Sequence, residues 1–190
     1  MKFFGIPKSV TTMIRHADMS DAIAMQQLIA QAFPLACPPQ TAKDDIEIHL
    51  ANQCSSEIFK SYIANDKTAV IVACDGSNLL GFAILIFAET TSARVAQALT
   101  SVSETVELSK FYVSPSQHGQ GIAQKLMHRC FELVNELGWS ALWLNVNQQN
   151  ERANRFYEKM GFTIVGECDF LLGSSIQKDF IRERFFTVAT

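Results

Sequence analysis

One stretch of the chain decides the fold, the sequence FYVSPSQHGQGIA at residues 111–123. It begins with the last residues of a strand-forming run that extends over 106–113. A loop with Gly119 and Gly121 follows, and from there apolar residues recur at helical spacing on one stripe. The residues of this stripe are Ile122, Leu126, Cys130, Leu133 and Leu137. A strand that passes through a glycine loop into a long helix predicts an α/β fold.

The same patterns extend the prediction in both directions along the chain. Strand-like runs lie at 12–17, 68–74, 79–87, 106–113, 141–146, 162–165 and 180–188. Helical periodicity is found at about 20–33, 42–50, 57–59, 119–138 and 150–160. Turns are expected at 75–78 and 173–175, and the segment 89–104 is left open as a short helix or a loop. This order of elements predicts a mixed sheet.

Length and composition limit the classes of protein to which the chain can belong. Its 190 residues predict a single domain, residues 1–190, and an apolar share of 48% excludes a disordered binding segment. The net charge of −3 excludes the positive field that non-specific nucleic-acid binding needs. The longest apolar run, 79–88, has the length of a strand, so no membrane span is expected. Met1–Pro7 is short and broken by proline, which argues against a secretory signal.

The cysteines and histidines predict neither disulfides nor a metal site. The cysteines are odd in number and contain no Cys-x-x-Cys pair: Cys37, Cys54, Cys74, Cys130 and Cys168. This pattern favours free thiols in a reducing compartment, the cytoplasm. The histidines are scattered, and none pairs with a thiol or carboxylate at metal-ligand spacing: His16, His49, His118 and His128.

The loop at 114–121 is the first candidate binding site. The first N–H groups of the helix that follows it have no partners within the helix, and the helix dipole adds partial positive charge there. Gly119 and Gly121 let a phosphate approach the backbone without meeting a Cβ atom. The loop matches neither a Walker motif nor the full dinucleotide fingerprint. It predicts a pyrophosphate held mainly by main chain, against the alternative of an ordinary tight helix entry.

A second motif follows the next predicted strand, NQQNERANRFYEKMGF at residues 147–162. Together the two motifs resemble the GCN5-related N-acetyltransferase (GNAT) family. The loop is similar to that family's Gln/Arg-x-x-Gly-x-Gly/Ala acyl-CoA motif, and the second segment to its Asn-x-x-Ala-x-x-Phe-Tyr-Glu-Lys-x-Gly-Phe signature. The resemblance covers the chain from about Thr12 to its end.

This resemblance implies a fold and a co-substrate. The fold is the α/β GNAT fold, a central mixed, mostly antiparallel twisted sheet of about seven strands with helices on both faces. The acyl-CoA-binding core is expected at about 106–165. The co-substrate implied is acetyl-CoA, with no metal.

The resemblance also assigns residues to the binding of acetyl-CoA. Those expected to contact the pantetheine arm are Phe111 and Val113, through their backbone, and Asn150; Tyr112 and Asn147 are also expected among the cofactor-binding residues. Those expected to hold the pyrophosphate are His118, Gly119, Gln120, Gly121, Ile122 and Ala123. His118 stands where the family usually has Gln or Arg. Since the loop binds mainly through backbone N–H groups, and an imidazole still donates one hydrogen bond, we expect this change to be tolerated.

The implied reaction is direct acetyl transfer to an amine. Tyr157 matches the family's usual general acid, which protonates the departing CoA thiolate; the alternative is a buried helix tyrosine. A phenol of ordinary pKa is protonated at neutral pH. Glu107, on the strand that leads to the loop, is the candidate general base; the alternative is a solvated strand-end carboxylate. Cys130 lies on the apolar stripe of its helix and is not expected to be a nucleophile.

Charge and a second resemblance bear on the acceptor. Residues 44–107 contain nine acidic side chains against three basic ones, which attracts a cationic amine. The run 170–181 looks like the tail of a bacterial branch that acetylates spermidine and spermine, through Gly173, Gln177 and Asp179. A small amine of polyamine type is therefore expected by resemblance. The alternative acceptors are an aminoglycoside, an amino acid and a protein N-terminus. The alternative function is a non-catalytic acyl-CoA-binding module, and a homodimer is a further possibility for the assembly.

Overall fold

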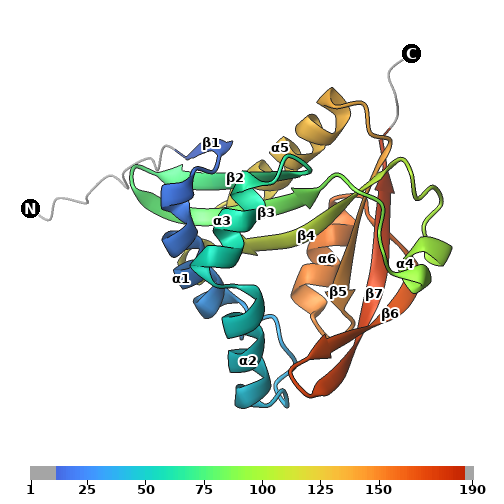
Figure 1. The fold of residues 1–190 in the computed structure, drawn as a ribbon, viewed down its shortest axis with the longest axis horizontal. Coiled ribbons are helices and arrows are strands. Elements are labelled where there is room, and N and C mark those ends of the chain that lie inside the picture. Colours follow the sequence, from blue (N-terminus) through green and yellow to red (C-terminus); the bar gives the residue numbers. More distant parts are fainter. Residues whose placement is uncertain (1–11, 187–190) are drawn as a thin grey trace, which may run out of the picture.

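The centre of the fold is a seven-stranded sheet with the strand order β1-β2-β3-β4-β5-β7-β6 (Figure 1). The computed structural model describes residues 12–186 of the chain. The strands are β1 (Met13–His16), β2 (Thr68–Asp75), β3 (Asn78–Ile86), β4 (Thr105–Val113), β5 (Ala141–Asn147), β6 (Thr163–Leu172) and β7 (Ser175–Phe185). Neighbouring strands are antiparallel except β4 and β5, which are parallel. The predicted mixed, mostly antiparallel sheet is confirmed.

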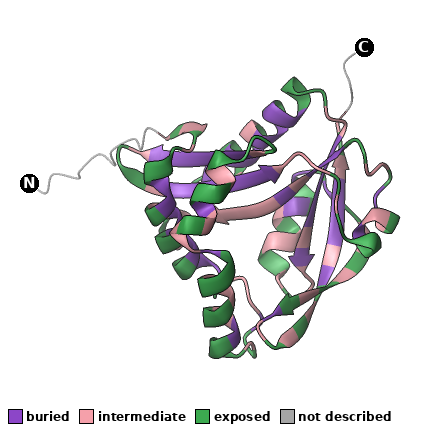
Figure 2. Cartoon of the chain, in the orientation of Figure 1, coloured by how far each residue is buried: buried purple, intermediate pink, exposed green. Residues whose placement is uncertain are grey.

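Helices cover both faces of this sheet. They are α1 (Ala22–Ala32), α2 (Lys43–Gln53), α3 (Ser56–Ala64), α4 (Ala93–Ala98), α5 (Ile122–Glu136) and α6 (Glu151–Lys159). Alternate residues of β3 serve the two sides: Phe82 belongs to the core under α1 and α3, and Ala83 to the core under α5. The two cores contain much of the buried surface seen along the strands in Figure 2. Among residues 12–186, no helix is both long and apolar enough to cross a bilayer.

The parallel pair β4–β5 is the irregular point of the sheet. Thr105–Glu107 of β4 pairs with Ala141–Trp143 of β5, and within the described chain the pairing of these strands ends there. Beyond it, β4 stays beside β3, with a bulge at Ser109, while β5 stays beside β7. The facing edges of the two strands therefore separate. Backbone N–H and C=O groups along these edges have no strand partner on that side, so they are available to a ligand.

The last hairpin is longer than the sequence predicted. Residues 163–165 and 180–185 of the two predicted runs belong to β6 and β7, which pair from Thr163 to the turn at Gly173 and back. The residues between these runs were not predicted as strand because they include charged side chains, which are uncommon in strands. Here they lie on the exposed side of the ribbon: Glu167, Asp169 and Lys178.

Two other predictions can be compared with the structure. The segment 89–104, left open as helix or loop, contains α4, whose first turn is capped by the Ser92 side chain. Val188, at the end of the last predicted strand, and Met1–Pro7 lie outside the described residues.

Helix α2 is fastened to the tip of the β6–β7 hairpin. The buried Asp45 carboxylate accepts hydrogen bonds from the backbone N–H of Ser174 at 2.7 Å and from its hydroxyl at 3.0 Å. Gly173 turns the chain there with a φ of +59°, and a Cβ at this position would lie 2.6 Å from the Cα of Asp45. Glycine is therefore required at Gly173 both for its backbone angle and for the close approach of α2.

Replacing Gly173 with alanine is expected to lower the free energy of unfolding by about 3 kcal/mol, because the methyl group adds a steric overlap to the strained φ. Gly76→Ala is the matched control. Gly76 has a φ of +57° in the β2–β3 turn, and a Cβ there meets no atom within 4 Å, so the loss should be about 1 kcal/mol. Urea unfolding of both variants measures the difference. Equal losses would contradict the contact between α2 and the hairpin.

Candidate active site

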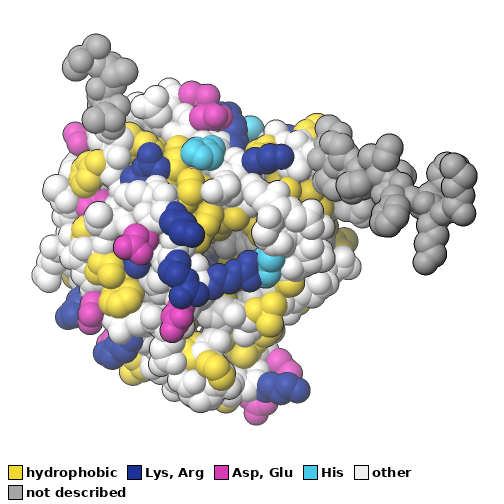
Figure 3. All heavy atoms as spheres, turned by 180° about the vertical axis from the view of Figure 1, so that it is seen from behind, with side chains coloured by type: hydrophobic (Ala, Val, Ile, Leu, Met, Phe, Trp, Pro, Cys, Tyr) yellow, Lys and Arg dark blue, Asp and Glu magenta, His cyan; other side chains and the backbone are white. Residues whose placement is uncertain are grey.

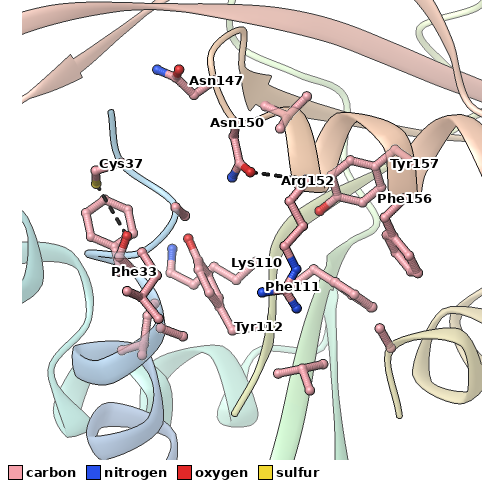
Figure 4. Close-up of a pocket in the computed structure, with 18 of the residues that line it drawn as sticks. Phe33, Cys37, Lys110, Phe111, Tyr112, Asn147, Asn150, Arg152, Phe156 and Tyr157 are labelled. Carbon is pink, nitrogen blue, oxygen red and sulfur yellow. Dashed lines mark hydrogen bonds between the residues drawn. The ribbon is translucent and has the colours of Figure 1, made fainter. Parts of the chain in front are cut away.

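A cavity of about 650 Å³ lies where β4 and β5 separate (Figure 4). Its walls come from β4, β5, the loop before α5, one side of α6, the segment after α1, and the β6–β7 hairpin. The residues predicted from the sequence that line it are Phe111, Tyr112, Val113, His118, Gly119, Gly121, Ile122, Ala123, Asn147, Asn150 and Tyr157. Gln120 and Glu107, which were also predicted as site residues, are not among its lining residues.

The glycine loop forms one end of the cavity and has the expected backbone geometry. Gly119 and Gly121 have φ values of +80° and +78°, and Gly121 is the N-terminal cap residue of α5 without a capping side chain. A Cβ at either glycine would meet nothing within 4 Å, so the space beside the loop is open. The N–H groups of the first turn of α5 have no partners within the helix and are free to bind an anion. The side chain of Gln120 instead donates to the Ser116 carbonyl.

His118 lies beside a cation that sequence analysis did not assign. The Nη1 atom of Arg152, in the first turn of α6, is 2.6 Å from Nδ1 of His118. A guanidinium can only donate, so Nδ1 accepts and the ring proton is on Nε2. Burial, and then the charge of Arg152, lower the pKa of His118, which keeps the imidazole neutral at neutral pH.

Basic side chains surround this end of the cavity. Arg152, Arg155 and Lys159 are exposed residues of α6 that line it. Figure 3 shows Lys, Arg and His side chains gathered around a hollow on the face of the molecule that α5 and α6 cover. Together with the free N–H groups of α5, they make this end attractive to a polyanionic group such as a diphosphate. A signal was present in the sequence, because all three follow Asn150 within the second motif.

Asn150 and Asn147 shape the wall between β5 and α6. The Asn150 side chain caps α6 by accepting from the Ala153 N–H at 3.1 Å, which leaves its amide NH₂ directed into the cavity (Figure 4). Asn147 accepts from the Gln149 N–H with its side chain, at 2.9 Å. Its backbone carbonyl accepts from the side chain of Asn154. The Asn150 amide is thus a donor available to a ligand lying between β4 and β5.

Tyr157 lies in the middle of the cavity. Its ring packs against Phe111, Phe156 and Phe162, with centroids 5.5 to 6.4 Å apart, and its hydroxyl points into the cavity in Figure 4. Burial raises the pKa of Tyr157 well above its ordinary value, so the phenol stays protonated throughout the neutral range. The residue can therefore donate a hydrogen bond to an acceptor in the cavity.

Glu107 occupies a different place. It pairs with Trp143 in the last register position before β4 and β5 separate, and its side chain is half-buried. Burial raises the pKa of Glu107, partly offset by a hydrogen bond with Ser109 and by the charge of Lys110. The strand position was predicted correctly, but the structure does not place this carboxylate among the lining residues of the cavity.

A buried carboxylate that was not predicted as a site residue lines the cavity instead. Asp179 of β7 is 4% exposed, and its Oδ2 accepts from the Asn145 side chain at 2.5 Å. Its Oδ1 has no hydrogen-bond partner within the described chain. Burial raises the pKa of Asp179 to about 6, with a smaller opposing effect of the Asn145 hydrogen bond. The signal in the sequence was an aspartate in a strand-forming run, where this residue is uncommon.

The wall opposite α6 is mostly aromatic. Phe33 stacks on His49 with ring centroids 4.6 Å apart, and Phe170 and Tyr112 pack against the same pair. Burial, and then the charge of Lys110, lower the pKa of His49, so this ring is neutral at neutral pH. Lys110 itself lines the cavity, next to Tyr112 in Figure 4. This wall offers apolar area and one positive charge.

Residues 12–186 bring together no group of three His, Cys, Asp or Glu side chains that could hold a metal ion. The described side chains and backbone offer an anion-binding end, a protonated phenol and a buried carboxylate.

Comparisons with known proteins point to one family. Residues 23–162 match the model of the acetyltransferase (GNAT) family. An uncharacterised N-acetyltransferase of Mycobacterium bovis is 36% identical over 166 residues, which cover 87% of this chain and 98% of the relative. Streptothricin acetyltransferase of Streptomyces lavendulae is 30% identical over 103 residues, 54% of this chain and 48% of the relative. The structure of the PaiA N-acetyltransferase of Thermoplasma acidophilum in complex with coenzyme A has a TM-score of 0.75 at 20% identity, covering 93% of this chain and 99% of that chain.

Replacing Arg152 with glutamine is expected to raise the pKa of His118, because the positive charge beside Nδ1 is removed while burial persists. An NMR titration of the His118 ring resonances in both proteins measures the change. An unchanged His118 titration would show that the two side chains are not in contact in solution.

Proposed function

This chain belongs to the acetyltransferase (GNAT) family, and we propose that it transfers an acetyl group from acetyl-CoA to the primary amine of a small cationic acceptor. One observation carries this proposal: the cavity between the separated strands β4 and β5 has an anion-binding loop at one end and, in its wall, a buried carboxylate with one oxygen that has no partner among the described residues. Acetyl-CoA is long and polyanionic at one end, and an amine acceptor is a cation. The two substrates match the two parts of the cavity in charge.

The binding of acetyl-CoA follows from the backbone geometry. We place the diphosphate on the free N–H groups at the start of α5, between Gly119 and Ala123. His118 lies beside it, and Arg152, which contacts His118, adds a positive charge. The pantetheine amides pair with the open backbone edge of β4 at Phe111 and Val113, as an added strand does. Asn147 and Asn150 border the same gap. The thioester then lies near Tyr157.

The reaction proposed is direct attack of the amine nitrogen on the thioester carbonyl carbon. Tyr157 donates a hydrogen bond to the leaving sulfur and supplies its proton as the C–S bond breaks. A covalent acyl-cysteine intermediate has little support, because burial raises the pKa of every cysteine near the site. The thiols that line the cavity are Cys37, with a pKa raised to about 11, and Cys54, and the fully buried Cys130 does not line it. Glu107 stays the sequence-based candidate for the general base; from its position it acts only through water.

The acceptor is proposed to be of polyamine type, which rests on the resemblance of the run 170–181 and on the carboxylate of Asp179. A second class has support from one observation: Lys110 lines the cavity, and its charge favours an acceptor with a carboxylate as well as an amine. Amino acids and the N-termini of short peptides are such acceptors.

Three further proposals, on the domain, the location and the partners of the chain, rest mainly on the sequence. We propose one domain with an acyl-CoA-binding core at about 106–165, to which the loop and α6 belong. A cytoplasmic location is favoured by the five free cysteines. The net charge of −3 argues against nucleic acid as a partner.

A panel of amines tests the proposed function. Release of free CoA thiol from acetyl-CoA is followed with spermidine, spermine, an aminoglycoside, amino acids and a peptide with a free N-terminus. Rapid release with spermidine or spermine supports the polyamine type, and a preference for amino acids or peptides supports the second class. CoA binding without thiol release on any amine would identify a non-catalytic binding module instead.

Gly121→Asp is expected to weaken CoA binding at least about 100-fold, because a side chain with a negative charge would stand where the diphosphate binds. Gly138→Asp is the matched control. Gly138 follows the other end of α5 with a φ of +77° and open space around it, so the same strain is added away from the cavity. Isothermal titration with CoA measures both. Equal affinity for CoA in the two variants would contradict the assignment of the diphosphate to this loop.

Tyr157→Phe is expected to lower kcat about 100-fold and to leave the Kd for CoA within about 2-fold, because only the proton donor is lost. Phenylalanine keeps the ring contacts with Phe111, Phe156 and Phe162, so the fold should persist. Tyr62→Phe, in α3, is the control and should keep the wild-type kcat. Steady-state kinetics with the best amine of the panel decide; an unchanged kcat in Tyr157→Phe would exclude the role.

A further inference from the structure

We infer that Asp179 binds the ammonium group of the acceptor and accepts its proton when the amine attacks acetyl-CoA. This inference rests on the proposed function and names the residue that recognises the reacting amine. Asp179 lies in β7 opposite Asn147 of β5 and Cys168 of β6, beyond the point where β5 has left β4. Its side chain lines the same cavity as Tyr157.

The carboxylate is held in place but only half satisfied. Asp179 is 4% exposed, and the Asn145 side chain donates to Oδ2 at 2.5 Å. Oδ1 has no partner within the described residues. A buried polar atom without a partner is unfavourable, and an ionised one is more so. An arrangement that fixes one oxygen and leaves the other open is that of a binding site for a hydrogen-bond donor, which an ammonium group provides.

The charges around the cavity indicate a cation at this place. Asp179 is the only carboxylate among the cavity-lining residues of the described chain. The cations at the α6 side are Arg152, Arg155 and Lys159, close to the loop assigned to the diphosphate. When acetyl-CoA is bound, its phosphates neutralise those cations. Two charged lining residues are then left, Lys110 and Asp179, and the buried one is Asp179. A ligand ammonium would remove the cost of that buried charge.

Asp179 is better placed for this role than Glu107. Glu107 pairs with Trp143 inside the region where β4 and β5 are still bonded, and it does not line the cavity. Asp179 does line it, together with Tyr112 and Tyr157. The negative charge of Asp179 contributes to the raised pKa of Tyr112, which follows mainly from burial, so the carboxylate and the two phenols form one group.

The proton balance of the reaction is complete with these groups. The acceptor enters as an ammonium ion and gives one proton to Oδ1 of Asp179, from which it passes to solvent. The free amine forms a C–N bond with the thioester carbon, and the C–S bond breaks. Tyr157 gives its proton to the sulfur and regains one from the nitrogen. The products are an amide, CoA thiol and one released proton.

This role predicts that the rate of acetyl transfer depends on pH. Burial raises the pKa of Asp179 to about 6, so below that pH the carboxyl is protonated and cannot receive the ammonium proton. The titratable or charged groups around it are Cys168 of β6, Lys110 and Tyr112 of β4, Tyr157 of α6 and His49 of α2. The value of kcat/KM should therefore fall as the pH is lowered through about 6.

The test compares wild type, Asp179→Asn, Glu107→Gln and a matched control, Asp169→Asn. Asp169 is an exposed carboxylate of β6 paired with Lys178, and it does not line the cavity. CoA binding and amine binding in the presence of CoA are measured by calorimetry. Values of kcat/KM are measured from about pH 5 to 9 with spermidine, lysine and a dialanine peptide as probe amines.

The expected result for Asp179→Asn is a kcat/KM at least about 100-fold lower at neutral pH, with CoA affinity within about 2-fold of wild type and lost amine binding. The deficit should shrink as the pH rises toward the pKa of the amine, because a free amine needs no proton acceptor. The acid limb near pH 6 should be absent in this variant and present in Asp169→Asn.

Four outcomes overturn the inference. In the first, Asp179→Asn has the same kcat/KM and amine binding as Asp169→Asn; in the second, its loss of kcat/KM is the same at every pH, as for a structural role. In the third, only Glu107→Gln removes the acid limb of the pH profile; in the fourth, the wild type binds none of the probe amines. In the first three the wild type still acetylates amines, so the proposed function stands. Amine binding that depends on Asp179 without thiol release in wild type would instead contradict the proposed function and support the ammonium site.

Discussion

The arrangement of the site depends on the early end of pairing between β4 and β5. Only Thr105–Glu107 and Ala141–Trp143 bond to one another, and beyond them each strand keeps its outer neighbour, β3 or β7. Backbone groups in a folded protein need partners, so two strand edges that separate inside a sheet leave groups with which a ligand that carries amides can pair. The same separation brings the β4 end, the start of α5 and the side of α6 around one cavity. Fold and binding site are thus consequences of one local feature.

Charge divides this cavity into two parts. The loop before α5 offers free N–H groups, and Arg152, Arg155 and Lys159 add formal positive charge beside it. The opposite part carries Asp179, a buried carboxylate in an otherwise aromatic and apolar wall. Tyr157 lies between the two, protonated because burial raises its pKa. Under the proposed function, a polyanionic donor binds in the first part and a cationic acceptor in the second, with Tyr157 as the proposed proton donor.

What the sequence could predict was local. The loop residues His118 to Ala123 and the pair Asn150 and Tyr157 could be predicted as site residues because the motifs depend on spacing along one loop and one helix. All of these except Gln120 line the cavity, as do Phe111, Tyr112, Val113 and Asn147. Arg152 stands in the second motif and Asp179 in the run 170–181, but their place in the cavity depends on which strands and helices meet in space. Glu107 was placed on its strand correctly, but whether a β4 side chain reaches the cavity depends on where pairing with β5 ends. The length of β6 and β7 was missed because their exposed side is charged.

A crystal structure with bound CoA is the most direct test of the relation between strand separation and cofactor binding. We expect the pantetheine arm between residues 108–113 of β4 and 144–147 of β5, bonded to backbone of β4. We expect the diphosphate oxygens within hydrogen-bond distance of the amides at the start of α5. A structure in which β4 and β5 pair along their full lengths, or in which CoA lies outside this gap, would contradict the central claim.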